Sequence, residues 1–142
     1  SGNVSANYFV GTATQAQYAD LAEKYSADND YEPGTVVKIG GEAEVTQTTE
    51  RADTEVFGVV STSPAYLMNS EALGVPIALQ GRVPVRVVGK VKKGERLVSS
   101  DVPGVAWALG DDEYDTRSVI GRSLENKEDG DLGTVEAVIG VK

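Results

Sequence analysis

Residues 78–98 have the sequence ALQGRVPVRVVGKVKKGERLV, and this stretch decides the fold class. At residues 83–87 the odd positions carry valine, whereas the even positions carry proline and arginine. A period of two places one face of a strand in a core and the other in solvent. Gly81 and the Lys-Lys-Gly sequence at 92–94 mark turns. The stretch therefore predicts strands of a half-exposed antiparallel sheet joined by tight turns, and it contains no catalytic motif.

The composition is typical of a single globular domain. The chain has 142 residues, of which 40% are hydrophobic and 25% are charged. It has no cysteine and no histidine, which excludes disulfides, thiolate metal sites, cysteine nucleophiles and Ser-His-Asp triads. The net charge of −9 disfavours nucleic acids and anionic membranes as partners. We therefore expect no nucleic-acid binding. Because no stretch is apolar enough to span a bilayer, we also expect no membrane insertion.

Two parts are expected along the chain, a leader at residues 1–14 and a single β-rich domain at residues 15–142. Within residues 16–25 the apolar side chains recur at i, i+3, i+4 and i+7, which predicts a short amphipathic helix. The apolar stripe of this helix consists of Tyr18, Leu21, Ala22 and Tyr25. A helix of about three turns is not stable alone in water. The stripe must therefore pack on its own domain or on copies of itself.

Beyond residue 34, short apolar segments alternate with turn sequences. Gly40-Gly41 separates the first two predicted strands as a hairpin. Residues 56–60 are expected to be buried on both faces, and residues 61–76 are expected to form a long loop whose segment 66–68 covers an opening of the core. The other predicted strands include 134–141, with valine, alanine and isoleucine on one face. The strands are expected at 35–39, 43–48, 56–60, 77–79, 83–88, 95–98, within 102–108, and at 118–125 and 134–141.

These strands and the N-terminal helix predict a mainly β fold, a compact antiparallel barrel or sandwich.

Charged residues gather in two kinds of cluster. A basic run stands out in the acidic chain and comprises Arg82, Arg86, Lys90, Lys92, Lys93 and Arg96. It is either an anion or phosphate site or a solvated strand face whose charges meet acidic loops. No aromatic residue interleaves the run, which further disfavours single-stranded nucleic acid as a partner.

Three acidic clusters, at residues 28–32, 111–115 and 128–131, are candidates for calcium binding or for ordinary turns. Calcium takes six to eight oxygen ligands, and none of the clusters matches the twelve-residue calcium loop with its central glycine. Aspartate suits turns by itself. We therefore predict no metal site at these clusters. The sequence also identifies no cofactor site and no catalytic residue.

Three aromatic residues are candidates for contact with a glycan: Trp107, Tyr66 and Tyr114. Exposed aromatic rings can stack on sugar rings, whereas a lone tryptophan is more often part of a core. A carbohydrate-binding module is therefore one of the functions left open.

Several phrases of the sequence resemble a known family in their order. They are YFVGTATQA at 8–16, YADLAEKY at 18–25, GVVSTSP at 58–64, ALQGRVPV at 78–85 and IGRSLE at 120–125. The chain resembles the carboxy-terminal domains of tail-fibre and neck-appendage proteins of tailed phages, especially marine and cyanobacterial T-even-like phages. It is also similar to the self-cleaving intramolecular chaperone domains of Bacillus-phage appendages.

The resemblance implies a virion structural protein, the distal domain of a homotrimeric fibre that nucleates trimerisation, caps the shaft or contacts the host surface. The stripe at residues 18–25 would then lie near the threefold axis. The alternative is a chaperone domain that cleaves itself, although no catalytic residue is assigned for that step. Under these readings the partners are further copies of the chain and a host glycan or receptor. The Ser1-Gly2 start is typical of either a cleavage product or a cloning boundary.

Overall fold

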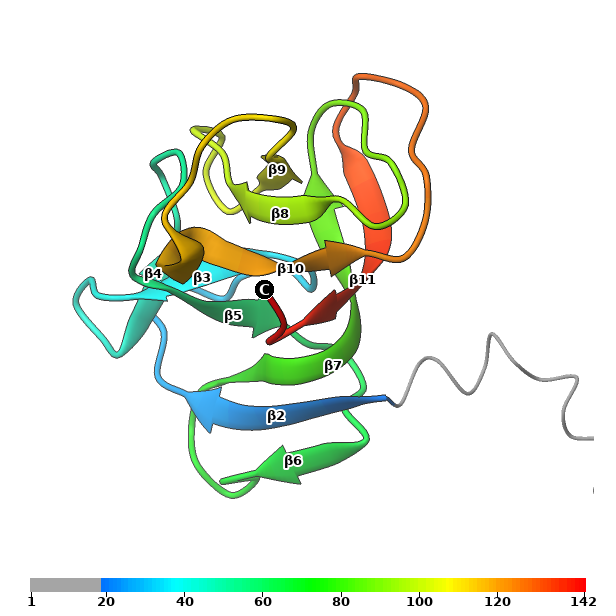
Figure 1. The fold of residues 1–142 in the computed structure, drawn as a ribbon. Helices are drawn as coiled ribbons and strands as arrows, with labels where there is room; N and C mark the ends of the chain where they lie inside the picture. The colour runs from blue at the N-terminus through cyan, green and yellow to red at the C-terminus, as the bar shows by residue number, and fades with distance from the viewer. Residues whose placement is uncertain (1–18) are drawn as a thin grey trace, which may run out of the picture.

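The computed structural model describes residues 19–142, and strands dominate the fold (Figure 1). Within these residues the helical structure is a single 3₁₀ turn, η2 (Thr116–Ser118). The predicted mainly β fold is therefore confirmed. The strands are β2 (Asp20–Tyr25), β3 (Val36–Ile39), β4 (Val45–Gln47), β5 (Val56–Val60), β6 (Tyr66–Met68), β7 (Val75–Val87), β8 (Arg96–Ser99), β9 (Ala106–Ala108), β10 (Val119–Ser123) and β11 (Gly133–Ile139).

Five of the strands close into a barrel in the order β7-β11-β10-β8-β9. β11 pairs antiparallel with the second half of β7, from Gly133 opposite Val87 to Ile139 opposite Gly81. The barrel closes where β9 meets β7 in parallel at Val87 and Ala106. The core is made of small and branched apolar side chains that alternate along these strands, as the period of two predicts. The buried members are Val36, Val59, Ala78, Val83, Val85, Val87, Val91, Leu97, Ala106, Ile120, Val135, Ala137 and Ile139.

β7 is a single 13-residue strand, where the sequence predicted two strands around Gly81. Gly81 has a φ of +108°, and a Cβ at this position would lie 2.4 Å from the carbonyl oxygen of Ala19. A residue without a side chain is required there because the backbone before β2 approaches closely. The first half of β7 pairs with β2 and β5, and its second half pairs with β11.

A second sheet region extends from the first half of β7 through β5 and β3 to β4. Neighbouring residues of these strands enter different cores: Val36 faces the barrel core, whereas Val37 belongs to a second apolar cluster. The same alternation holds for Val59 and Val60, so the prediction that residues 56–60 are buried on both faces is confirmed for the C-terminal half of β5. The predicted hairpin of β3 and β4 is confirmed as an antiparallel pair.

The predicted N-terminal helix is wrong over residues 20–25, which form strand β2, and residues 16–18 lie outside the described residues. β2 pairs antiparallel with β7 and parallel with β6. The helical spacing of the apolar residues is outweighed by backbone hydrogen bonds to two distant segments, which a short helix could not make.

The predicted loop at residues 61–76 is also corrected, because Tyr66–Met68 form the edge strand β6. No lid is needed to explain this segment, since it continues the sheet beside β2 (Figure 1). At the C-terminus, Val135, Ala137 and Ile139 share the core face as predicted. Val141 does not, because β11 ends at Ile139 and Val141 is 37% exposed.

Candidate functional site

The edge formed by β2 and β6 exposes apolar side chains. Leu21 lies opposite Tyr66 in the parallel register of the two strands. Leu21 is 37% exposed and Tyr66 is 64% exposed. Within residues 19–142, β6 pairs with no strand other than β2. This combination of an unpaired strand edge and exposed apolar residues is the pattern of a surface that can pair with another chain.

The residues predicted for an oligomer interface are not all at this surface. Leu21 is exposed, but Ala22 is completely buried. The ring of Tyr25 packs edge-on against Phe57, with centroids 4.9 Å apart, and is half-buried. Tyr18 lies outside the described residues. The edge position of Tyr66 could not be predicted from the sequence, because its pairing with β2 depends on contacts more than 40 residues apart along the chain.

The hydroxyl of Tyr25 donates a hydrogen bond to Glu23 Oε1 at 2.7 Å. Burial and this carboxylate raise the pKa of Tyr25 to about 12. The tyrosine therefore remains a neutral donor at physiological pH and links two side chains on one face of β2. Its role is to hold the strand, rather than to take part in acid–base chemistry.

A pocket of about 190 Å³ that holds two carboxylates opens where β2 and β11 flank β7. Asp20 lies opposite Gly81 on one side of β7, and Glu136 lies opposite Pro84 on the other. Asp20 is 3% exposed, and its Oδ2 accepts a hydrogen bond from Ser61 Oγ at 2.7 Å. The pocket is lined by Asp20, Ser61, Thr62, Ser63, Arg82, Val83, Pro84 and Glu136.

The two carboxylates of this pocket both resist ionisation. Burial raises the pKa of Asp20, and the hydrogen bond from Ser61 opposes that rise only in part. Burial also raises the pKa of Glu136; Arg82 opposes the rise, while Glu125 and Asp20 add to it. A serine hydroxyl held on a buried carboxylate with a raised pKa is a pair that general acid–base chemistry can use.

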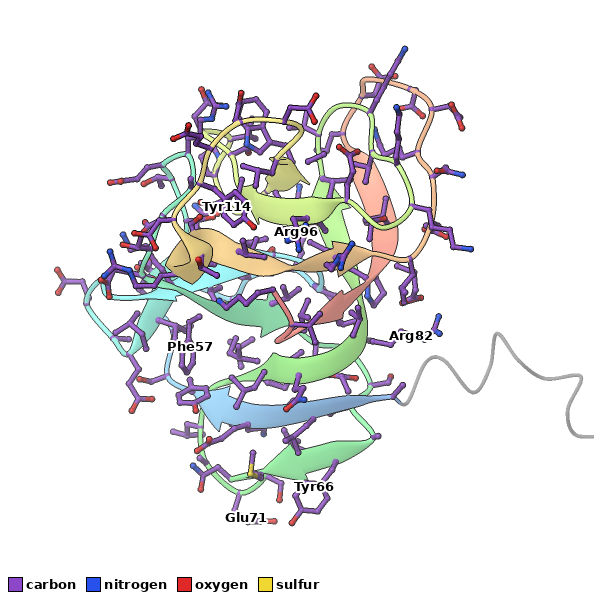
Figure 2. The ribbon with its side chains drawn as sticks, in the orientation of Figure 1. Phe57, Tyr66, Glu71, Arg82, Arg96 and Tyr114 are labelled. Atoms are coloured by element: carbon purple, nitrogen blue, oxygen red, sulfur yellow. The ribbon has the colours of Figure 1, made fainter. Side chains whose placement is uncertain are left out.

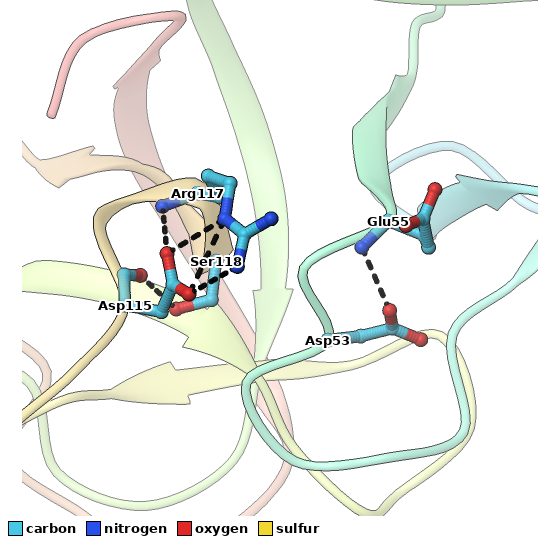
Figure 3. A network of polar contacts seen from close by, with 5 residues as sticks. All are labelled: Asp53, Glu55, Asp115, Arg117 and Ser118. Atoms are coloured by element: carbon cyan, nitrogen blue, oxygen red, sulfur yellow. Dashed lines mark hydrogen bonds and ion pairs between the residues drawn. The ribbon is translucent and has the colours of Figure 1, made fainter.

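An aspartate of each predicted acidic cluster contacts other residues of the chain, and Figure 3 shows the contacts of Asp115. Asp115 accepts hydrogen bonds from the backbone and the guanidinium of Arg117, which lower the pKa of Asp115 to about 2. In the other two clusters, Asp28 accepts hydrogen bonds from Tyr31 and Thr46, and Asp129 pairs with Lys127 at 2.9 Å. Among residues 19–142, no group of three or more acidic side chains is arranged to hold a metal ion.

Asp53, also shown in Figure 3, joins the second sheet region to the barrel. Its Oδ1 accepts a hydrogen bond from Glu55 N at 2.8 Å, and its Oδ2 accepts one from Lys38 Nζ on β3 at 2.6 Å. The backbone nitrogen of Asp53 donates to Ser99 Oγ on β8 at 2.9 Å. Burial opposes ionisation, but the hydrogen bonds from Lys38 and Glu55 outweigh it and lower the pKa of Asp53.

Two of the three candidate glycan contacts, Tyr66 and Tyr114, lie on different surfaces of the molecule (Figure 2). Tyr66 lies on β6, whereas Tyr114 lies in the loop between β9 and η2, on the β8–β10 side of the barrel. Trp107 is half-buried on β9, and the guanidinium of Arg51 covers its ring at 4.6 Å from the centroid. A common stacking platform of the three residues is therefore not formed, although each remains a candidate by itself.

No protein family and no curated protein sequence matches this chain. Residues 19–142 contain no helix with the length and apolar character needed to cross a membrane.

Proposed function

We propose that this chain is a phage virion structural protein, the distal domain of a homotrimeric tail fibre or appendage. The observation that carries the proposal is the unpaired β2–β6 edge, where Leu21 and Tyr66 are exposed side by side. Contact between copies at this edge would join the domains along β2 and β6.

The closed barrel gives this role a physical basis. A five-stranded barrel presents no free edge of its own, so it can remain folded while a neighbouring strand pairs with another copy. A compact domain of this kind can bring three chains into register before the slower pairing of a long shaft. Its proposed place is the virion, and its proposed partners are further copies of the chain and the host surface.

The mass of the chain in solution tests this proposal, measured by light scattering during size-exclusion chromatography. We expect about three times the chain mass of 14.9 kDa for the natural sequence. The double variant Leu21→Ser with Tyr66→Ser should elute as a folded monomer. Leu132→Ser is the matched control, since Leu132 is 52% exposed in the loop between β10 and β11, away from the edge.

Either of two results would contradict the proposal. One is a monomeric natural chain over a wide range of concentrations. The other is a trimer that the double variant leaves intact while its circular dichroism spectrum is unchanged, because the edge would then play no part in assembly.

A second candidate function is self-cleavage, as in the intramolecular chaperone domains that the sequence resembles. The observation that favours it is the hydrogen bond from the Ser61 hydroxyl to the buried carboxylate of Asp20. Asp20 could accept the proton of Ser61 as its hydroxyl attacks an upstream peptide carbonyl. The peptide C–N bond then breaks, Asp20 passes the proton to the departing amine, and water hydrolyses the ester that joins the upstream segment to Ser61, which leaves a shorter product.

Expression of the chain with a longer upstream segment tests the second candidate. We expect a shorter product that Ser61→Ala abolishes, whereas Ser63→Ala in the same pocket leaves cleavage intact. An extended chain of constant mass would exclude self-cleavage and leave the assembly proposal untouched.

A further inference from the structure

A second pocket, with a volume of about 380 Å³, lies beside β8 and β10 and is lined by several cationic side chains. Lys92 and Lys93 come from the turn before β8, Arg96 begins β8, and Arg122 lies on β10. Three of the six residues of the basic run therefore gather here and are joined by an arginine from a distant strand. The fold turns part of a linear basic run into a concave basic site.

The two arginines are in an unusual arrangement. Arg96 and Arg122 lie directly opposite each other in the antiparallel register of β8 and β10. Like charges placed opposite each other across two strands destabilise a sheet. The four ion pairs among residues 19–142 use other cations, so no carboxylate in that part of the chain pairs with either arginine. An anion bound between them would relieve this repulsion.

Arg96 also has an unused hydrogen-bond donor. Its Nε is buried and has no hydrogen-bond partner among residues 19–142. By contrast, Arg122 Nε donates to the carbonyl oxygen of Gly94 at 2.9 Å, which holds this guanidinium at the pocket. Buried polar groups in native proteins nearly always have a partner, so this lone donor marks Arg96 as a cation that no acceptor among the described residues stabilises at Nε.

The acidic residues of the pocket do not neutralise it. Four cationic and two acidic side chains line the pocket, in a chain whose overall net charge is −9. One of the two carboxylates, that of Glu95, accepts a hydrogen bond from the backbone nitrogen of Lys92 at 2.7 Å and so stabilises the turn. The pocket is therefore a local positive site that attracts small anions.

We propose that this pocket binds the carboxylate or phosphate group of an acidic sugar, with the sugar ring against Tyr114. Tyr114 lines the pocket and is 41% exposed, and it lies on the same side of the barrel as Arg96 (Figure 2). The guanidinium group matches the geometry of a carboxylate or phosphate, and a tyrosine ring offers an apolar face to a sugar. The acidic loop 111–115 borders the pocket and disfavours an extended polyanion such as a nucleic acid.

The pocket itself does not depend on the proposed assembly. The idea that the acidic sugar belongs to a host-surface glycan, however, rests on the proposed function. The two are separated by experiment, because binding is followed at residues of one pocket, whereas assembly is followed by mass.

The test is a nuclear magnetic resonance titration of the isotope-labelled 142-residue chain with glucuronate, inorganic phosphate and neutral glucose. We expect glucuronate and phosphate to shift the backbone signals of the pocket residues in a saturable way, with no such shift from glucose. Tyr114→Ala should weaken glucuronate several-fold and leave phosphate unchanged, since only the sugar contacts the ring.

Arg96→Gln is the decisive variant. It should weaken both anions by about tenfold or more and raise the melting temperature of the anion-free protein, because it removes one of two opposed charges. Lys90→Gln is the matched control: it removes the same charge from an exposed residue near the turn before β8 that does not line the pocket, and it should change affinity less than about twofold. If Arg96→Gln does not fold, Lys93→Gln provides the same comparison.

Four results would overturn the inference. They are the absence of saturable shifts with either anion, an equal loss of affinity in Lys90→Gln, tighter binding of a single-stranded DNA oligonucleotide than of glucuronate, and a Tyr114→Ala variant that binds glucuronate as the natural chain does. The last result would leave an anion site without a sugar contact, which is not the site proposed.

Discussion

The closed barrel and the β2–β6 edge both contain a strand that pairs with β7, yet they differ in whether every strand has a partner on both sides. In the barrel, β7, β11, β10, β8 and β9 form a ring in which each strand has two neighbours. At the edge, β6 has one neighbour among the described residues, and the apolar side chains of Leu21 and Tyr66 remain exposed. β7 therefore belongs both to a closed barrel, in which every strand is paired on both sides, and to a sheet region that ends in an edge unpaired within the described residues.

The difference separates residues needed for folding from residues available for assembly. Barrel positions are buried and tightly spaced, so changes there should lower the free energy of unfolding. Edge positions leave more of their side chains exposed, so changes there should affect association more than folding. The variants below test this division, from the largest expected effect to the smallest.

Gly121→Ala should have the largest effect, because it strikes the barrel where β10 meets β11. A Cβ at Gly121 would lie 2.2 Å from the carbonyl oxygen of Val138, so the two strands must move apart. We expect a loss of about 3 kcal/mol or more of unfolding free energy, measured by urea denaturation. Gly130→Ala is the control, since a Cβ there meets nothing within 4 Å. Equal effects of the two substitutions would show that close strand contact does not limit stability.

Asp53→Ala should have the next largest effect, because the Asp53 carboxylate accepts hydrogen bonds from Lys38 on β3 and from the Glu55 backbone. The change leaves the Lys38 ammonium and the Glu55 backbone nitrogen without their acceptor, at a cost of about 2 kcal/mol in urea denaturation. Asp112→Ala breaks the exposed ion pair with Arg51 and should cost about 0.5 kcal/mol or less. A larger loss from the exposed pair would contradict this ranking.

Asp20→Asn should change the pH dependence of stability at the seam between β2 and β7. Because burial raises the folded-state pKa of Asp20 above 3.8, its contribution is fully present below that value and is lost as the pH rises through the folded-state pKa. The asparagine variant does not ionise, so its stability relative to the natural chain should increase towards neutral pH in thermal unfolding.

Asp28→Asn should change the pH dependence of stability in the opposite direction to Asp20→Asn. Hydrogen bonds from Tyr31 and Thr46 lower the pKa of Asp28, so its contribution is present above 3.8 and is lost as the pH falls. This variant should therefore lose stability relative to the natural chain as the pH rises. Parallel pH curves for the two variants would refute the assignment of burial as the dominant influence on Asp20.

Leu73→Ser should have the smallest effect on folding. Leu73 is 95% exposed in the loop between β6 and β7, so its replacement should change the unfolding free energy by less than about 0.5 kcal/mol. Calorimetry of the chain at low concentration would check this value. A marked loss of stability under monomeric conditions would mean that this loop belongs to the folding unit.

Much of the sheet could be predicted from local patterns. Residues 56–60 form β5 as predicted, and Val135, Ala137 and Ile139 share the core face of β11. These features depend on a period of two in the side chains, which is a property of the strand itself. Strand boundaries elsewhere shifted by a few residues, because they depend on where the partner strand ends.

The candidate sites were much less predictable. Leu21 was singled out for an interface, but on a helix rather than an edge strand, and Tyr66 was expected in a loop. Ser61 and Glu136 carried no signal, since neither belongs to a motif that identifies a pocket. Arg122 was outside the basic run, and its position opposite Arg96 could not be read from residues 26 positions apart.

The sequence by itself determined the mainly β fold, the alternation that fills the barrel core and the exclusion of chemistry that needs cysteine or histidine. These are consequences of composition and of spacing between near neighbours. Only the tertiary structure decided that residues 20–25 form a strand, that β6 is an edge, that Asp20 is buried beside Ser61 and that two arginines face each other. Each of these depends on strand pairing between distant segments, whose hydrogen bonds and burial outweigh the local preference of the chain.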